Sequence, residues 1–226
     1  MIINKILFLK MDAGEEMYRI ITLGDSGVGK TSIMKRYVHN IFQGDCISTV
    51  GVGFSFKEAT VEDGTKIKLK LIDTAGQEKY RAISKSYYKN AEGALFVFAY
   101  DNQESFDHIE EWLNCFKDNR KNSDDKDNDQ DIPIVLIGNK YDVEKRVIND
   151  EKINDLKNRI GIVDFAKTSA KVNIGIEEVF KDLSQKIYNI NIKKKGKKQT
   201  KTKSMNLKSI KKERNKNKCL VCHADT

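Results

Sequence analysis

The chain has 226 residues with 39% hydrophobic side chains, one Pro and 14 Gly, a composition that excludes collagen-like and Pro/Gly-rich proteins. Its formal net charge of +8 lies at one end, because residues 193–226 carry 13 basic and 2 acidic side chains. No apolar run approaches the roughly 20 residues that span a bilayer, and four Cys are too few for a disulfide scaffold in a chain of this length. These features predict a cytoplasmic protein with a basic tail.

Strand-like apolar runs alternate with helical patterns along the chain. Strands are predicted at residues 18–23, 54–61, 66–72, 93–99, 132–138 and 163–166. Helices are predicted at residues 31–38, 105–116, 151–160 and 176–190. The dipeptide Asp63-Gly64, between the second and third apolar runs, favours a hairpin. This alternation predicts an α/β fold, with a mostly parallel six-stranded sheet, one antiparallel strand and helices on both faces.

Composition divides the chain into three parts. Residues 1–17 are predicted to be an N-terminal extension and residues 18–190 a globular domain. Residues 191–226 are rich in Lys, Asn, Ser and Thr, which predicts a disordered polybasic tail. Within the domain, residues 118–131 form an acidic insert in which Asp and Asn recur. The insert lacks the Gly and the bidentate Glu of a calcium-binding loop, which favours a solvated surface loop.

Residues 24–31 (GDSGVGKT) fit the phosphate-binding pattern G-x-x-x-x-G-K-[ST]. The motif lies between a predicted strand and a predicted helix, which distinguishes it from an ordinary Gly-rich turn. Backbone N–H groups and the helix N-terminus would surround the phosphates, with Lys30 at the β- and γ-phosphates and Thr31 on Mg²⁺. The nucleotide contacts predicted here are Asp25, Ser26, Gly27, Val28, Gly29, Lys30, Thr31 and Ser32.

Three further short motifs follow predicted strands. The first is DTAGQ at residues 73–77, in which the carboxylate of Asp73 is expected beside Mg²⁺ and Gly76 can donate its N–H to the γ-phosphate. The others are NKYD at 139–142 and SAK at 169–171. They add the predicted nucleotide contacts Asn139, Lys140, Asp142, Ser169, Ala170 and Lys171.

The carboxylate of Asp142 predicts which base is bound. Guanine presents its N1–H and N2–H₂ donors side by side, and one carboxylate can accept from both. Adenine lacks this donor pair, and a buried carboxylate left unpaired costs about 1–3 kcal/mol. All four motifs end strands at the same edge of the sheet, where α/β proteins bind their ligands. The sequence therefore predicts a guanine nucleotide site.

With these motifs, residues 18–190 resemble a small GTPase of the Ras superfamily, and within it the Rab branch. The resemblance extends to ISTVGVGF at 47–54, KLKLIDTAGQE at 68–78, YYKNA at 87–91 and QESF at 103–106. It implies the P-loop small GTPase fold, binding of GTP and GDP with Mg²⁺, slow hydrolysis of GTP, and a switch that regulates vesicle trafficking. The alternative is a scaffold that binds GTP and hydrolyses it negligibly.

The resemblance also assigns roles that spacing alone does not. Thr49 would place its hydroxyl on Mg²⁺, together with Thr31 and Asp73. Phe42 would pack against the base, and Gln77 would be the catalytic residue that orients the attacking water. Exchange factors, GTPase-activating proteins and effectors would bind a monomer through residues 42–56 and 73–88.

Some positions depart from the Rab pattern in the effector-facing patch. Gly53 stands where Rab proteins usually carry an acidic residue, and Ile72 stands where they carry Trp. That Trp usually joins two aromatic side chains, which are matched here by Phe54 and Tyr87. The single Trp of this chain, Trp112, lies at helical spacing from other apolar residues and is predicted to be in the core.

The C-terminal end carries two candidate lipidation sites, Cys219 and Cys222. Their spacing fits neither the adjacent or C-x-C pairs of Rab tails nor a C-a-a-X end. CLVCH at 219–223 also fits a haem attachment pattern, which the absence of a surrounding folded pocket disfavours. The basic run is expected to attract anionic lipids on the cytosolic face of an internal membrane. A solvated linker and a nuclear or nucleic-acid role are alternatives, and the scarcity of aromatic residues argues against nucleic acid.

Overall fold

The protein is described by a computed structural model that places residues 17–44, 48–76, 81–121 and 132–195. It comprises two units, Met1–Ile187 and Tyr188–Thr226. The described strands all lie in the first unit, and the described residues of the second, 188–195, are helical. Residues 191–195 were predicted to begin the disordered tail, and their helical state corrects that boundary. Lys is a good helix former, which explains why three consecutive lysines do not end the helix.

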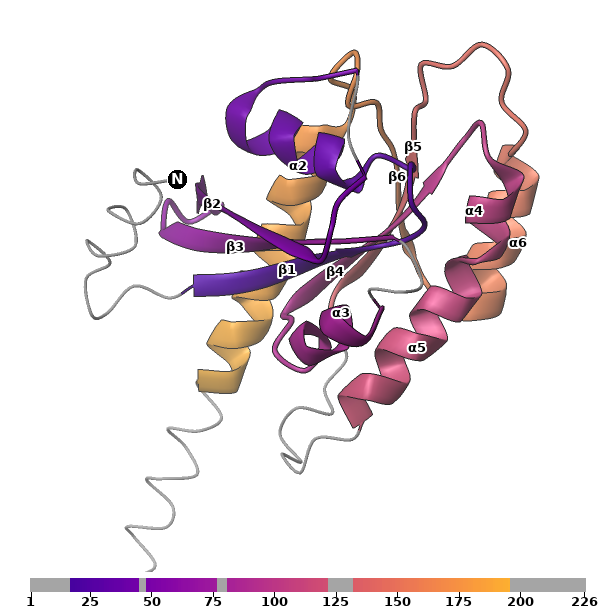
Figure 1. Ribbon diagram of the computed structural model, residues 1–226. Coiled ribbons are helices and arrows are strands. Elements are labelled where there is room, and N and C mark those ends of the chain that lie inside the picture. Colours follow the sequence, from indigo (N-terminus) through magenta and orange to yellow (C-terminus); the bar gives the residue numbers. More distant parts are fainter. Residues whose placement is uncertain (1–16, 45–47, 77–80, 122–131, 196–226) are drawn as a thin grey trace, which may run out of the picture. The chain divides into compact units, whose positions relative to one another are not determined.

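The first unit is built on a six-stranded sheet in the order β2-β3-β1-β4-β5-β6 (Figure 1). β1 pairs in parallel with β3 and β4, and β5 continues the parallel set to β6. β2 is antiparallel to β3, and the two flank the predicted Asp63-Gly64 turn. This arrangement confirms the predicted fold class. The strands are β1 (Met17–Leu23), β2 (Val52–Thr60), β3 (Lys66–Thr74), β4 (Gly93–Ala99), β5 (Ile134–Asn139) and β6 (Asp164–Lys167).

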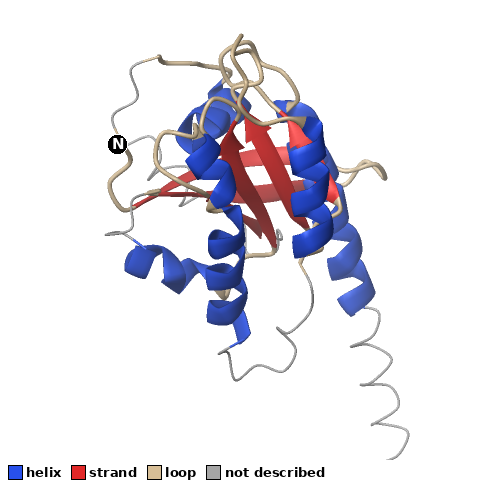
Figure 2. Cartoon of the chain, turned by 90° about the vertical axis from the view of Figure 1, so that its right-hand side faces the viewer, coloured by secondary structure: helices blue, strands red, loops and turns tan. Residues whose placement is uncertain are grey.

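Helices lie on both faces of the sheet (Figure 2). They are α2 (Lys30–His39), α3 (Arg81–Tyr88), α4 (Gln103–Asp107), α5 (Ile109–Lys121), α6 (Asp150–Ile160) and helical residues 176–187. On one face, the Tyr37 ring of α2 stacks on Phe180, with ring centroids 3.9 Å apart. None of the described helices is long and apolar enough to cross a membrane.

The helix predicted at 105–116 is two helices, α4 and α5, divided at His108. α4 begins earlier than predicted because the side chain of Asn102 caps it, accepting a hydrogen bond from the backbone N–H of Ser105. α5 ends at Lys121, inside the predicted acidic insert, whose residues 122–131 lie outside the described part of the chain.

An aromatic cluster fills the core beneath α5. Phe116 is 1% exposed and packs edge-on against Tyr88 and Phe96, with ring centroids 5.3 and 5.7 Å apart. Trp112 is also buried, which confirms its predicted place in the core. Both side chains lie on the face of α5 that meets the sheet, so the helix is held chiefly by burial of aromatic surface.

The packing predicts that Phe116→Ala lowers the free energy of unfolding by about 3–5 kcal/mol, because the change leaves a cavity between two rings. Urea denaturation of the full chain measures the effect. The matched control is Lys117→Ala, an exposed position on the same helix, where the change should stay within about 0.5 kcal/mol. Equal losses in the two variants would contradict the assigned packing.

Candidate functional site

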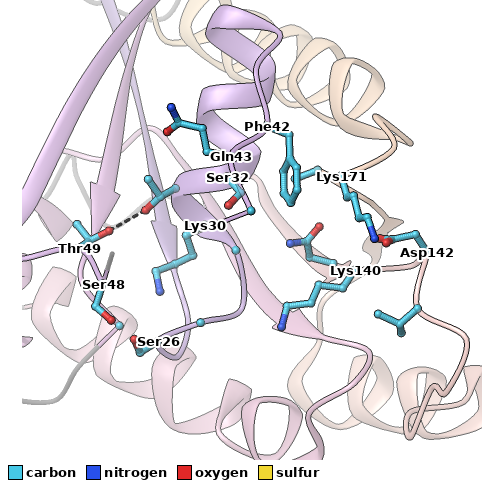
Figure 3. Close-up of a pocket in the computed structure, with 18 of the residues that line it drawn as sticks. Ser26, Lys30, Ser32, Phe42, Gln43, Ser48, Thr49, Lys140, Asp142 and Lys171 are labelled. Carbon is cyan, nitrogen blue, oxygen red and sulfur yellow. Dashed lines mark hydrogen bonds between the residues drawn. The ribbon is translucent and has the colours of Figure 1, made fainter. Parts of the chain in front are cut away.

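A cavity of about 390 Å³ opens at the edge of the sheet where the parallel strands end (Figure 3). All four sequence motifs contribute to its lining. The lining residues are Ser26, Gly27, Gly29, Lys30, Thr31, Ser32, Phe42, Gln43, Gly44, Ser48, Thr49, Thr74, Gly76, Asn139, Lys140, Asp142, Val143, Ala170 and Lys171. Segments far apart in the sequence therefore meet in one place, as the motif positions predicted.

The phosphate-binding motif turns tightly between β1 and α2, and two of its glycines are required by close neighbours. A Cβ atom at Gly24 would lie 2.1 Å from the carbonyl oxygen of Val97, and one at Gly29 would lie 2.3 Å from Nδ2 of Asn139. Asn139 donates from Nδ2 to the carbonyl oxygen of Val28 at 2.8 Å. This bond ties the first motif to the third and fixes the loop over the end of β5.

Lys30 is a buried cation at the first helical position of α2. Its Nζ donates to the carbonyl oxygens of Gly24 and Asp25 at 2.7 and 2.6 Å. Burial lowers the pKa of Lys30 to about 8, although the charges of Asp73 and Asp25 oppose the shift. A buried ammonium group held by neutral carbonyls is suited to an anionic ligand, because an anion in the cavity would favour its charged form.

Three oxygen-bearing side chains converge beside this lysine. Oγ1 of Thr31 lies 2.6 Å from Oδ2 of Asp73 and 2.7 Å from Oγ1 of Thr49, the contact marked in Figure 3. Oδ1 of Asp73 is buried and has no hydrogen-bond partner among the described residues. Burial raises the pKa of Asp73, which the hydrogen bond from Thr31 and the charges of Lys30 and Lys35 oppose. Hydroxyl and carboxylate oxygens are the ligands that Mg²⁺ prefers, so this set fits that ion.

The opposite end of the cavity carries Phe42, Asp142 and Lys171 (Figure 3). Oγ of Ser169 donates to Oδ1 of Asp142 at 2.5 Å and accepts from the backbone N–H of Val172 at 3.2 Å. This pair orients the carboxylate at the cavity wall. Phe42 is 37% exposed, so part of the side chain is accessible to a ligand.

Asp25 has contacts that the sequence reasoning missed. Its carboxylate does not line the cavity, and instead Oδ1 accepts from Nε1 of Trp112 and Oδ2 contacts Nδ1 of His108, both at 2.7 Å. These partners tie the phosphate-binding loop to α5 and to the residue before it. Helical spacing predicts only a core position for Trp112. The further signal in the sequence is the polar N–H of its indole ring, which needs a partner when buried.

Other predicted residues fall outside the cavity or outside the described chain. Val28, Asp73 and Ser169 support the lining from behind through the hydrogen bonds above. Gln77 and the candidate lipidation sites Cys219 and Cys222 lie outside the described residues. The lining residues that were not predicted are Gln43, Gly44, Ser48, Thr74 and Val143, and each lies within two positions of a predicted one.

The predicted partner-binding segments meet through an aromatic pair. The rings of Phe54 and Tyr87 lie 5.4 Å apart at 63°, and Nζ of Lys70 lies 4.4 Å above the Phe54 ring. Ile72, which replaces the usual Trp, is paired with Phe54 across β2 and β3 and is buried. The patch therefore keeps two aromatic rings and lacks the third.

The contact with Asp25 predicts that His108 stabilises the fold in a pH-dependent way. The hydrogen bond to Asp25 is the main reason why the pKa of His108 is raised; its partial burial opposes the shift, and Glu104 and Glu111 add to it. The stabilisation is thus complete below about pH 6.5, the ordinary His pKa, and is lost as the pH rises through the raised value. Since the side chain is 39% exposed, the effect is small.

Melting temperatures of the wild type and His108→Gln between pH 6 and 9 measure this effect. The difference should be largest near pH 6 and shrink towards pH 9. The matched control is His39→Gln, an exposed position at the end of α2. A His108→Gln difference that stays constant or grows with pH would contradict the assigned pair.

Comparison with known proteins identifies the family. Residues 19–189 match the model of the Ras family. Ras-related protein Rab-10 of Diplobatis ommata is 40% identical, covering 76% of this chain and 81% of the relative. Rab-8A of Bos taurus is 37% identical, covering 76% and 78%. Rab-13 of Bos taurus is 34% identical, covering 92% and 97%. The chain therefore belongs to the Ras family, and it is a Rab-like small GTPase.

Proposed function

We propose that the cavity binds GTP or GDP with Mg²⁺, that the protein hydrolyses GTP slowly, and that it acts as a Rab-like switch in vesicle trafficking. The observation that carries the proposal is the chemistry of the two ends of one cavity. One end holds the buried Lys30 beside the oxygens of Thr31 and Thr49, and the other holds the Asp142 carboxylate. A triphosphate needs the first kind of group and a guanine base needs the second, and one cavity provides both.

At the phosphate end, Mg²⁺ would be held by Thr31 and Thr49, with the Asp73 carboxylate completing the set, and would neutralise phosphate charge when bound. The ammonium group of Lys30 would exchange its two carbonyl partners for phosphate oxygens. The short loop before α2 would donate backbone N–H groups, as helix N-termini do for phosphates. The nucleotide contacts we propose at this end are Asp25, Ser26, Gly27, Val28, Gly29, Lys30, Thr31, Ser32, Thr49, Asp73 and Gly76.

At the base end, the Asp142 carboxylate would accept the N1–H and N2–H₂ donors of guanine while Ser169 holds its orientation. The Phe42 ring would pack edge-on against the base. The contacts we propose at this end are Phe42, Asn139, Lys140, Asp142, Ser169, Ala170 and Lys171.

Hydrolysis would depend on Gln77, which we propose orients the attacking water. None of the cavity-lining residues of the described chain is an arginine. In the related Ras case, unaided turnover is of the order of 10⁻⁴ s⁻¹, and a partner that supplies an arginine accelerates it roughly 10⁵-fold. We therefore propose that this protein depends on a GTPase-activating partner in the same way.

Partner binding would use residues 42–56 and 73–88, whose conformation the γ-phosphate would control. The Phe54–Tyr87 pair lies across these two segments and would form part of the effector surface. The basic residues beyond 192 would bring a monomer to anionic lipids on the cytosolic face of an internal membrane. Lipidation at Cys219 or Cys222 would make that attachment lasting.

Replacement of Asp142 tests the base assignment. We expect Asp142→Asn to weaken GDP binding about 10- to 100-fold and to favour xanthine nucleotides, because the amide cannot accept from both guanine donors. Competition between fluorescent GDP and unlabelled GDP, XDP or ADP in magnesium buffer measures the preference. The matched control is Asp150→Asn, which removes an exposed pair with Lys167. Wild-type protein that retains neither GTP nor GDP would refute the proposed function itself.

Replacement of Gln77 tests the hydrolytic step. Single-turnover hydrolysis of bound GTP should slow roughly tenfold or more in Gln77→Leu, because the water loses its orienting group, while GDP affinity stays close to that of the wild type. The control is Gln103→Leu, at the first turn of α4. Wild-type protein that binds GTP without measurable hydrolysis would instead favour the scaffold alternative.

A further inference from the structure

Arg36, in the last turn of α2, connects two segments that border the base end of the cavity. Its Nε donates to the carbonyl oxygen of Ala170 at 2.9 Å, and its Nη2 donates to that of Lys171 at 3.2 Å. Its Nη1 donates to the backbone oxygen and Oδ1 of Asn40 at 2.9 and 3.1 Å. One guanidinium group thus makes four hydrogen bonds, and each acceptor is a neutral oxygen of one of the two segments.

The first segment contains the residues proposed to lie beside the base. Ala170 and Lys171 both line the cavity, and they follow Ser169, which orients Asp142. The strand β6 ends at Lys167, so this loop continues past the sheet without a strand neighbour of its own. It is closed by a short bridge between Ser169 and Ile174. The bonds from Arg36 are therefore a main link between this loop and α2.

The second segment leads to Phe42. Asn40 ends α2 in a left-handed conformation, with φ 55° and its N–H bonded to the carbonyl oxygen of Arg36. Arg36 donates back to the same residue, so Asn40 is held on both its N–H and its oxygen atoms. Phe42 follows two residues later and lines the same end of the cavity as Asp142 (Figure 3). The guanidinium group thereby bonds both to a loop that lines the base end and to the residue that leads into Phe42.

The shape of the side chain matters for this role. A guanidinium group presents five donors in a rigid plane, so that it can reach carbonyls on two segments at once. A lysine at position 36 would keep the charge and the stem, but its single nitrogen could not span the same acceptors. Because all four acceptors are uncharged oxygens, the positive charge of Arg36 alone does not explain why its side chain lies between these two segments.

We propose that Arg36 is a positioning residue of this site, which holds the 169–171 loop and the segment before Phe42 at the spacing that retains a guanine base. The proposal rests on the proposed function, because it requires that the cavity bind a guanine nucleotide. Arg36 acts through Ala170 and Asn40 and is not itself expected to touch the base. It sets the dwell time of the nucleotide and leaves the chemistry at the γ-phosphate unchanged.

The test compares release of the nucleotide with hydrolysis in the full-length protein. We expect Arg36→Gln to release fluorescent GDP about 10- to 100-fold faster than the wild type in magnesium buffer, because several charge-assisted hydrogen bonds are lost. Single-turnover hydrolysis of GTP that is already bound should stay within about twofold. Arg36→Lys should release GDP nearly as fast as Arg36→Gln. The matched control is Arg159→Gln, which removes an exposed pair with Glu110 far along the chain.

The outcomes separate this proposal from the proposed function. A wild type that retains no GDP refutes the proposed function and this inference with it. A wild type that retains GDP, with an Arg36→Gln variant that releases it at the same rate, overturns only the positioning role. Loss of hydrolysis in step with faster release shows a general structural role and overturns it as well. If Arg36→Gln does not fold, Arg36→Lys decides: wild-type release overturns the proposal, and faster release with intact hydrolysis supports it.

Discussion

The site depends on one electrostatic constraint, a carboxylate and an ammonium group buried at the end of the sheet. Asp73 is the last residue but one of β3 and Lys30 is the first residue of α2, and both are at most 7% exposed. Each charge is costly to bury alone. Burial lowers the pKa of Lys30 and raises the pKa of Asp73, so that it favours the neutral form of both groups. They are kept there by the carbonyls of the turn and by Thr31. A ligand that carries a polyphosphate and a divalent cation would place a negative charge beside Lys30 and a positive charge beside Asp73. The same two groups therefore account for the structure of this edge of the sheet and for the proposed ligand.

The fold was largely predictable because apolar runs and turn residues are local signals. The meeting of the four motifs in one cavity was equally predictable, because each motif lies at the end of a strand and the parallel strands end at the same edge of the sheet. Side-chain contacts between segments far apart in the sequence were not predictable. The bonds from Trp112 and His108 to Asp25 join residues more than 80 positions apart, and no periodicity encodes them. The division of the predicted helix at His108 was not predictable either, because the helical spacing of apolar residues continues through that position.

The proposed effector surface around Phe54 and Tyr87 differs from the usual Rab pattern at Ile72. Ile72 occupies a strand position, where β-branched residues are favoured, and it is buried and paired with Phe54 across β2 and β3. What is lost is an aromatic ring beside Phe54 and Tyr87, and Lys70 lies over the ring that remains. A partner that fits three aromatic rings would find a smaller and more cationic surface here. Selectivity among effectors would then follow from shape and charge at these few positions.

Two helices contact the cavity at its two ends, and Thr49 joins the oxygen cluster from the segment between α2 and β2. α5 holds the phosphate-binding loop through Asp25, and α2 holds the base end through Arg36. Val50, which directly follows Thr49, is apolar and 73% exposed. The hydroxyl of Thr49 is hydrogen-bonded to that of Thr31, which also contacts the Asp73 carboxylate. A ligand that competes for that hydroxyl would therefore move exposed apolar surface, which is the physical requirement for a nucleotide-dependent switch.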